Sequence, residues 1–177
     1  LKHGHGVRKE KDGNKYDGQW VEGMMSGQGV YTYANGDVYS GGFVADKRSG
    51  KGNFKGKDGY SYEGDWLDGR ISGVGKVTYP DGSVYEGQFA NDLADGKGKI
   101  TYKDGSTYEG EWKAGVIEGI GKATYANGLI YEGSFAKGKN EGKGKMTYPD
   151  GYVYDGDWKD GTRDGQGMAT YADGTIY

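Results

Sequence analysis

Hydrophobic and polar residues alternate along this chain in short runs that recur every 23 residues. In the segment 62–84, the run YEGDW alternates aromatic residues and glycine with charged residues. A second alternating run lies at 75–79, and the two-residue period of both runs predicts strands with one buried face. The segment between them, LDGRISG, contains glycine and predicts a hairpin loop. Each 23-residue phrase is therefore expected to form a β-hairpin.

The phrase starts at seven tyrosines at a constant spacing of 23 residues, with no insertion or deletion. A fixed period of this kind predicts a repeat array in which each repeat contacts mainly its neighbours. Residues 1–15 match the second half of a repeat, and Tyr177 matches the first residue of another, so we expect a segment of a longer array. No linker interrupts the repeats, which predicts a single domain over 1–177. The full repeats, first to seventh, are 16–38, 39–61, 62–84, 85–107, 108–130, 131–153 and 154–176.

Glycine inside the strands predicts an unusual core. Only 33% of the residues are hydrophobic, while 38 are glycine and 17 are tyrosine, so a two-layer core of Leu, Ile and Val is not available. At Gly64 and Gly75 the missing side chains leave slots on the aromatic face in which rings can lie flat. We therefore expect a ladder of interleaved rings, each burying roughly 150–250 Å².

The charged residues predict cross-strand pairs on the opposite, polar face. If Trp66 lies opposite Gly75, Asp65 lies opposite Lys76 and Glu63 opposite Thr78. Glu111 and Lys122 repeat the first of these pairs in the fifth repeat. Such pairs are expected to reinforce the register of the strands, on a face that is otherwise solvated.

The segment 108–128, YEGEWKAGVIEGIGKATYANG, resembles the MORN repeat, as do the repeats that start at Tyr62, Tyr85, Tyr131 and Tyr154. The resemblance covers essentially the whole chain. Two kinds of residue depart from the repeat. Gly56 replaces a tyrosine, and Phe54 is expected to supply the ring there. Asp46 and Asp92 replace a loop glycine.

The resemblance implies an all-β fold, an elongated single-layer antiparallel sheet that bears a groove. It also implies scaffolding, dimerisation, cytoskeletal or junctional organisation and the binding of partner peptides. The family name records a proposed affinity for phospholipids. Several members of the family carry a catalytic domain beside the repeats, which this chain does not contain.

Catalytic and metal-binding chemistry find little support in the residues. The chain has no cysteine, which excludes thiol chemistry and cysteine-based zinc sites. His3 and His5 are two residues apart and are weak metal candidates without a third ligand nearby in sequence. The carboxylates recur in nearly every repeat, unlike a unique active site. We predict that the chain is not an enzyme and uses no cofactor.

The charged residues indicate whether a nucleic acid or an anionic lipid is an expected partner. The net charge is −3 with both signs interspersed, so no nucleic-acid partner is expected. No apolar run reaches membrane-spanning length. One compact basic cluster is a candidate for anionic lipid, but acidic repeats flank it, so weak or no phospholipid binding is predicted. This cluster consists of Lys47, Arg48, Lys51, Lys55 and Lys57.

A second period of 46 residues underlies the first. The fifth position of the repeat alternates between Trp and Phe, and the thirteenth alternates between Lys in even repeats and Gln, Val or Ile in odd ones. Two interpretations are open: repeats duplicated in pairs, with Trp and Phe in equivalent core slots, or a strip of apolar residues that binds a partner. The candidate partner-binding residues are Met24, Met25, Ile71, Val74, Val116, Ile117 and Ile120.

Terminal hairpins expose an unpaired edge, which predicts two-fold association of identical ends and hence a homodimer. The predicted function is a non-catalytic, dimerising scaffold for protein partners in a cytoskeletal or membrane-adjacent assembly. The predicted location is cytoplasmic, at the cytoskeleton or the membrane periphery. The alternatives are a phosphoinositide- or membrane-binding module, and a regulatory segment of a larger enzyme.

Overall fold

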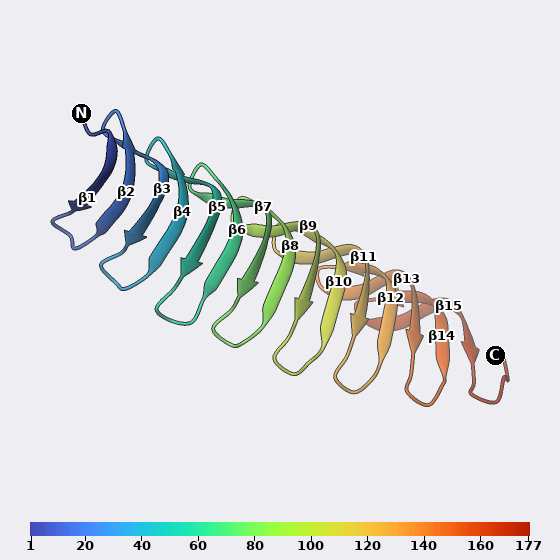
Figure 1. Cartoon of the computed structure of the whole chain (residues 1–177). Coiled ribbons are helices and arrows are strands. Elements are labelled where there is room, and N and C mark those ends of the chain that lie inside the picture. The colour runs from blue at the N-terminus through green and yellow to red at the C-terminus, as the bar shows by residue number, and fades with distance from the viewer. The chain divides into compact units, whose positions relative to one another are not determined.

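The computed structural model describes residues 1–177 and contains fifteen β-strands and no helix (Figure 1). The strands follow one another in chain order in one antiparallel sheet, which confirms the all-β fold of successive hairpins. Backbone contacts divide the chain into two compact halves, Leu1–Leu93 and Ala94–Tyr177, which are described separately. The single domain over 1–177 stays a prediction.

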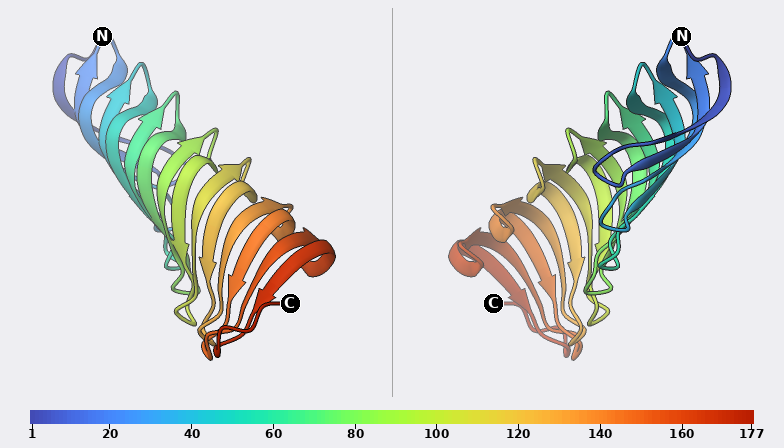
Figure 2. Two further views of the ribbon diagram at one scale, coloured as in Figure 1. Left: turned by 90° about the vertical axis from the view of Figure 1, so that its right-hand side faces the viewer. Right: turned by 90° about the vertical axis from the view of Figure 1, so that its left-hand side faces the viewer.

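The N-terminal half contains eight strands. They are β1 (Gly4–Lys9), β2 (Lys15–Val21), β3 (Met24–Thr32), β4 (Val38–Val44), β5 (Lys47–Lys55), β6 (Ser61–Leu67), β7 (Arg70–Thr78) and β8 (Val84–Ala90). Figure 2 shows that these strands bend along their length, and that tight turns lie along one edge of the sheet and longer turns along the other.

The C-terminal half repeats this arrangement. Its strands are β9 (Leu93–Thr101), which starts at the last residue of the N-terminal half, β10 (Thr107–Lys113), β11 (Val116–Thr124), β12 (Ile130–Ala136), β13 (Lys139–Thr147), β14 (Val153–Lys159) and β15 (Thr162–Thr170).

The hairpin loop is shorter than the sequence pattern indicates. In the third repeat, β6 ends at Leu67 and β7 begins at Arg70, so only Asp68 and Gly69 form the turn. Both have a positive φ, 50° and 81°, as in the type I′ turns that match the twist of a hairpin. The expected loop over 67–73 is therefore wrong, because most of its residues belong to β7.

Asp46 and Asp92, which replace the turn glycine, adopt the same left-handed conformation with φ of 69°. Their carboxylates accept hydrogen bonds at 2.8 Å from the backbone N–H groups of Met25 and Ile71 in the preceding repeat. Aspartate tolerates this conformation better than most residues. The departure from glycine thus adds a link between neighbouring repeats.

The expected strand register is also wrong. In the third repeat Gly64 lies opposite Gly75 and Glu63 opposite Lys76, and Trp66 lies opposite Ile71. In the fifth repeat Lys122 pairs with Glu109 rather than Glu111. The register shifts because a β-bulge interrupts the hairpin between Gly64 and Trp66. The alternation in the sequence does not reveal such a bulge. The bulge keeps the same two strands paired and changes only which residue of the partner strand lies opposite each position.

The first tyrosine of each repeat occupies the slot that the glycines leave. A Cβ atom on Gly75 would lie within 2.3 Å of the Tyr62 hydroxyl, and the Cα of Gly75 would lie 2.5 Å from a Cβ on Gly64. The Tyr62 hydroxyl donates a hydrogen bond of 2.8 Å to the carbonyl of Asp65, the residue that faces the bulge in β7. This confirms the predicted slots and explains why tyrosine, and not phenylalanine, stands at this position.

These tyrosines form the predicted ladder of rings. In the N-terminal half, Tyr39 packs edge-on against Phe43 of its own repeat and Trp66 of the next, with ring centroids 5.1 Å apart in both pairs. Tyr131 makes the same contacts with Phe135 and Trp158 in the C-terminal half, at 4.9 and 5.4 Å. The rings of Tyr39 and Tyr131 are fully buried. Because each ring bridges two repeats, the core is continuous within each half.

Trp and Phe share one slot but are not equivalent. The Trp66 Nε1 group donates a hydrogen bond of 3.1 Å to the carbonyl of Gly52 in the preceding repeat. Trp158 makes the same bond to Gly144 at 2.9 Å. Phenylalanine cannot donate this bond, so the alternation gives every second junction between repeats an extra polar contact.

We expect Trp66→Phe to lower the free energy of unfolding by about 1–3 kcal/mol, because it leaves the buried Gly52 carbonyl without its donor. Urea unfolding followed by far-UV circular dichroism measures this. As a control, Val74→Ala on the exposed face should change the free energy by less than about 0.5 kcal/mol. Equal stability of Trp66→Phe and the wild type would contradict a role for the indole N–H.

Alkaline pH should unfold the sheet through its buried tyrosines. Burial raises the pKa of Tyr39 to about 12 and that of Tyr131 to about 12. Because the folded state holds these protons more tightly than the unfolded state, the stability is fully present below pH 10 and is lost as the pH rises through about 12. Phenolate absorbance and circular dichroism, recorded together, should change in parallel over this range. Ionisation of all tyrosines near pH 10 with intact β-structure would refute this expectation.

Candidate functional site

The predicted apolar strip divides between the two faces of the sheet. In the N-terminal half, Met25 and Ile71 are buried on the aromatic face, opposite Trp20 and Trp66. Met24 and Val74 lie on the polar face and are 37% and 56% exposed. In the C-terminal half Ile117 is half-buried on the aromatic face, whereas Val116 and Ile120 are exposed. The seven residues therefore do not form one strip, and only the exposed ones are accessible to a partner.

The lysines that alternate with this strip have structural partners. Lys51 forms an ion pair with Asp65 of the next repeat, and Lys143 pairs in the same way with Asp157. The Lys51 ammonium and the backbone N–H of Val74, both hydrogen-bonded to Asp65, hold the pKa of that carboxyl below its usual value. A lysine at the thirteenth position of one repeat is thus matched by an acid at the fourth position of the next repeat.

The basic cluster does not form one patch. Arg48 lies on the aromatic face, where its guanidinium stacks on the Trp66 ring at 4.5 Å and donates a hydrogen bond of 2.8 Å to the Gly69 carbonyl. Lys47 and Lys51 occupy alternate positions of the same strand, β5, whose side chains point to the polar face. Lys55 ends that strand, and Lys57 belongs to the longer turn beyond it. A flat membrane would therefore not contact all five at once.

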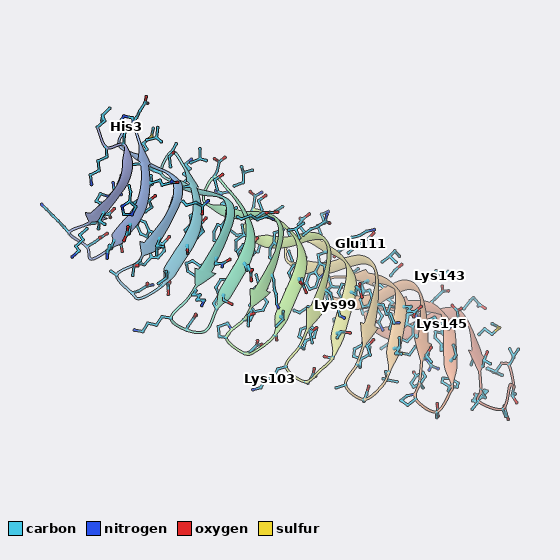
Figure 3. All side chains as sticks on the ribbon, in the orientation of Figure 1. His3, Lys99, Lys103, Glu111, Lys143 and Lys145 are labelled. Atoms are coloured by element: carbon cyan, nitrogen blue, oxygen red, sulfur yellow. The ribbon has the colours of Figure 1, made fainter.

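The two histidines have separate partners. His5 lies 2.7 Å from the carboxylate of Asp17, and His3 Nδ1 accepts a hydrogen bond of 3.4 Å from the backbone N–H of Glu22. His3 is labelled in Figure 3 near the start of the chain. No group of three or more His, Cys, Asp or Glu side chains is arranged to hold a metal ion. No helix in the structure is long and apolar enough to cross a membrane.

A second row of rings, which we name the aromatic row, runs beside the buried ladder in the N-terminal half. Its successive ring centroids lie 4.7, 6.3, 6.0 and 6.2 Å apart. All five rings are half-buried, in contrast to the fully buried ladder. The aromatic row consists of Tyr31, Tyr33, Phe54, Tyr60 and Tyr79.

Tyr60 gives the aromatic row its continuity. The eighteenth position of the other six full repeats is tyrosine, but in the second repeat it is Gly56. Tyr60, four residues later, contacts both Phe54 and Tyr79 and so bridges the interruption. The expectation that Phe54 supplies the missing ring is incomplete, because Phe54 keeps its own place in the row. A tyrosine at the twenty-second position of a repeat that lacks its usual tyrosine was the signal in the sequence.

A hollow opens beside the aromatic row, and Gly56 is one of its lining residues. Its volume is about 560 Å³, and Phe54 and Tyr60 form its apolar wall. Its rim is polar and carries two carboxylates and one ammonium group. The polar lining residues are Asn35, Asp37, Lys57 and Asp58.

The C-terminal half has a shorter row in which an arginine takes part. Tyr152 contacts Tyr148 and Tyr171, both at 5.1 Å between ring centroids. The Arg163 guanidinium donates hydrogen bonds of 2.8 and 2.7 Å to the hydroxyls of Tyr152 and Tyr148. These phenol contacts raise the pKa of the guanidinium although burial opposes this. The rings of this half are thus partly engaged by the chain itself.

The exposed apolar residues of the polar face were not predicted as a group. Val21, Val44 and Leu67 stand at the same position of the first three repeats and are 50%, 60% and 58% exposed. Side chains project from both faces of the sheet (Figure 3). The arrangement as a whole is suited to binding: it offers half-exposed rings on one face and exposed aliphatic groups on the other.

Sequence comparison identifies the repeats. Seven segments match the family described as the MORN repeat, at residues 16–38, 39–59, 62–84, 85–107, 108–130, 131–151 and 154–176. Alsin from Homo sapiens and alsin from Mus musculus are each 54% identical to this chain over 37 residues, which are 21% of this chain. The aligned part spans only 2% of the length of these relatives.

Two solved structures are similar to this chain at low sequence identity, and the first has a similar fold. The TCP domain of SAS-4 from Drosophila melanogaster, in complex with a proline-rich motif of Ana2, is 15% identical with a TM-score of 0.54. The similarity covers 98% of this chain and 87% of that one. The TCP10 domain of Danio rerio CPAP, in complex with a STIL peptide, is 17% identical with a TM-score of 0.41, covering 99% and 88%.

The seven matches extend from residue 16 to residue 176 and coincide with the hairpins of the sheet. The period, the glycine slots and the ring ladder recur in each of them. The chain therefore belongs to the MORN repeat family.

Proposed function

We propose that this chain is a non-catalytic scaffold that binds extended segments of partner proteins on the aromatic row. The observation that carries this proposal is the unbroken series of five half-exposed rings in the N-terminal half. Rings of the ladder are buried and complete the fold, whereas rings of the aromatic row keep part of their surface in water. Aromatic surface that stays accessible is enriched where proteins bind one another.

The structural comparison supports a protein partner. The SAS-4 domain of similar fold was solved with a bound peptide motif, so a sheet of this kind can hold a peptide. A bent sheet with one aromatic face offers such a segment contact along several strands. A cytoskeletal or membrane-adjacent assembly as the setting of this scaffold remains part of the proposal.

Homodimerisation and lipid binding stay predictions. The polar face of the N-terminal half offers a surface for self-association, since Val21, Val44 and Leu67 place aliphatic groups at one position of three consecutive repeats. The lipid alternative needs the basic cluster to act as a unit, and Arg48 is engaged on the other face. We therefore give protein binding precedence over lipid binding.

A random-peptide display library, panned against the immobilised chain, tests the proposal. Selected peptides should bind the wild type and lose at least about tenfold in affinity, some 1.4 kcal/mol, to Tyr79→Ala, which removes the last ring of the aromatic row. The matched control, Val44→Ser with Leu67→Ser, changes only the polar face and should leave the affinity unchanged.

Affinity lost in the polar-face control but kept in Tyr79→Ala would place binding on the wrong face and overturn the proposal. Failure to select any binding peptide would also overturn it.

Light scattering of the same variants over a range of concentrations tests self-association separately: a monomer at all concentrations contradicts the homodimer.

A further inference from the structure

We propose that the hollow at Gly56 is the specificity site of the aromatic row, and that its ligand is a proline-rich segment in the polyproline II conformation carrying a basic residue. This inference rests on the proposed function, because it names the chemistry of the partner for the same surface. Three features of the N-terminal half carry it: the spacing of the repeats, the shape of the hollow and the charge of its rim.

The spacing of the repeats matches the period of polyproline II. Each repeat adds two strands, which advance the sheet by about 9.4–9.8 Å at the usual strand spacing. A polyproline II helix has three residues per turn and advances about 9.3 Å per turn. A segment laid across the strands therefore presents one residue of the same face to each successive repeat. Proline at every third residue would contact the aromatic row once per repeat.

The chemistry of the rings suits this conformation. Proline is apolar, and its ring packs flat on aromatic side chains such as Phe54 and Tyr60. Polyproline II has no internal hydrogen bonds, so its carbonyl groups need donors from solvent or from a partner. Because the ligand is already extended before it binds, little conformational entropy is lost.

Gly56 makes one place in the row different from the others. Where other repeats carry tyrosine at this position, the second repeat leaves a hollow of about 560 Å³ beside Phe54 and Tyr60. A volume of this size lies within the usual range of small-ligand pockets, about 300–1,000 Å³. The row without the hollow would bind every extended apolar segment alike. The hollow admits one side chain more deeply and so fixes the register of the bound segment.

The rim of the hollow selects a positive charge. Asp37 accepts hydrogen bonds from the backbone N–H of Lys57 at 2.8 Å and from the Asn35 side chain at 3.0 Å. Asp58 accepts one from the backbone N–H of Tyr60 at 3.0 Å. These bonds hold both carboxylates in place and leave further lone pairs for a ligand. Two carboxylates outweigh the one lysine, so arginine or lysine next to the proline run is favoured over an acidic residue.

The probe is a fluorescent peptide of about twelve residues with proline at every third position and one arginine at its end. Fluorescence anisotropy should show saturable binding to the wild type. Two comparison peptides replace the prolines by alanine, or the arginine by glutamate, and each should bind at least about tenfold more weakly. Equal affinity for the alanine peptide, or no binding of the proline peptide up to about 1 mM, would overturn the inference.

Gly56→Tyr fills the hollow and should weaken binding of the proline peptide at least about tenfold. A Cβ atom at residue 56 would lie 2.8 Å from the carboxylate of Asp58, which must shift. The third repeat accommodates a tyrosine and an aspartate at the same two positions, Tyr79 and Asp81. There the Asp81 carboxylate accepts a hydrogen bond from the backbone N–H of Ser83. Circular dichroism checks that the variant folds. Unchanged affinity in the folded variant would refute the hollow as the site.

Asp58→Asn tests the rim without filling the hollow, so the inference stays testable even where Gly56→Tyr does not fold. Asparagine stands naturally at the same position of the first and fifth repeats, as Asn35 and Asn127. The variant should weaken the arginine peptide several-fold and leave a glutamine analogue unaffected. The matched control, Asp104→Asn in the fourth repeat, should change neither. Equal loss for both peptides would contradict selection by charge.

The library panned for the proposed function separates the two failures. Selected peptides that depend on Tyr79 but lack proline would overturn this inference while the scaffold function stands. A library that yields no ligand would contradict both the scaffold function and this inference. Enrichment of proline at every third position, with arginine or lysine alongside, would support both.

Discussion

Each hairpin of this sheet depends on one contact, a tyrosine ring lying on a pair of glycines. Gly64 and Gly75 approach so closely that no Cβ fits on either, and the Tyr62 ring fills the space. Its hydroxyl donates a hydrogen bond to the carbonyl of Asp65, a part-buried acceptor that faces the bulge. The bulge, the strand register and the position of the next ring all follow from this contact. The glycine and tyrosine content of the chain is therefore a structural requirement.

The contacts between repeats follow a period of two. Odd repeats place a tryptophan whose N–H bonds to the preceding repeat, as Trp66 does to Gly52. The third, fifth and seventh repeats also carry an acid opposite the bulge, such as Asp65, which pairs with a lysine of the preceding repeat. Even repeats carry phenylalanine in the ring slot and supply the lysine. The hydrogen bonds and ion pairs explain what this pattern contributes to the fold.

Departures from the repeat fall into two kinds. Asp46 and Asp92 replace turn glycines and tie the turn to the neighbouring repeat, so they strengthen the array. Gly56 and Tyr60 act differently, because together they keep the aromatic row continuous and leave a hollow beside it. A substitution that preserves a row and opens a space is suited to recognition, whereas one that adds a bond to the backbone is suited to stability.

The sequence by itself determined the family, the strands and the buried ladder, because a 23-residue period and a two-residue alternation are local properties of the chain. Only the tertiary structure decided the register, because the bulge adds two residues to β7 opposite Asp65, which keeps the two-residue alternation and shifts the partner of Trp66 to Ile71. It also decided the candidate site. Met24 and Met25 are adjacent in sequence and lie on opposite faces, so an apolar pair in the sequence became one buried and one exposed residue. The aromatic row joins residues from three repeats, and its continuity through Tyr60 depends on side-chain positions that no pattern specifies.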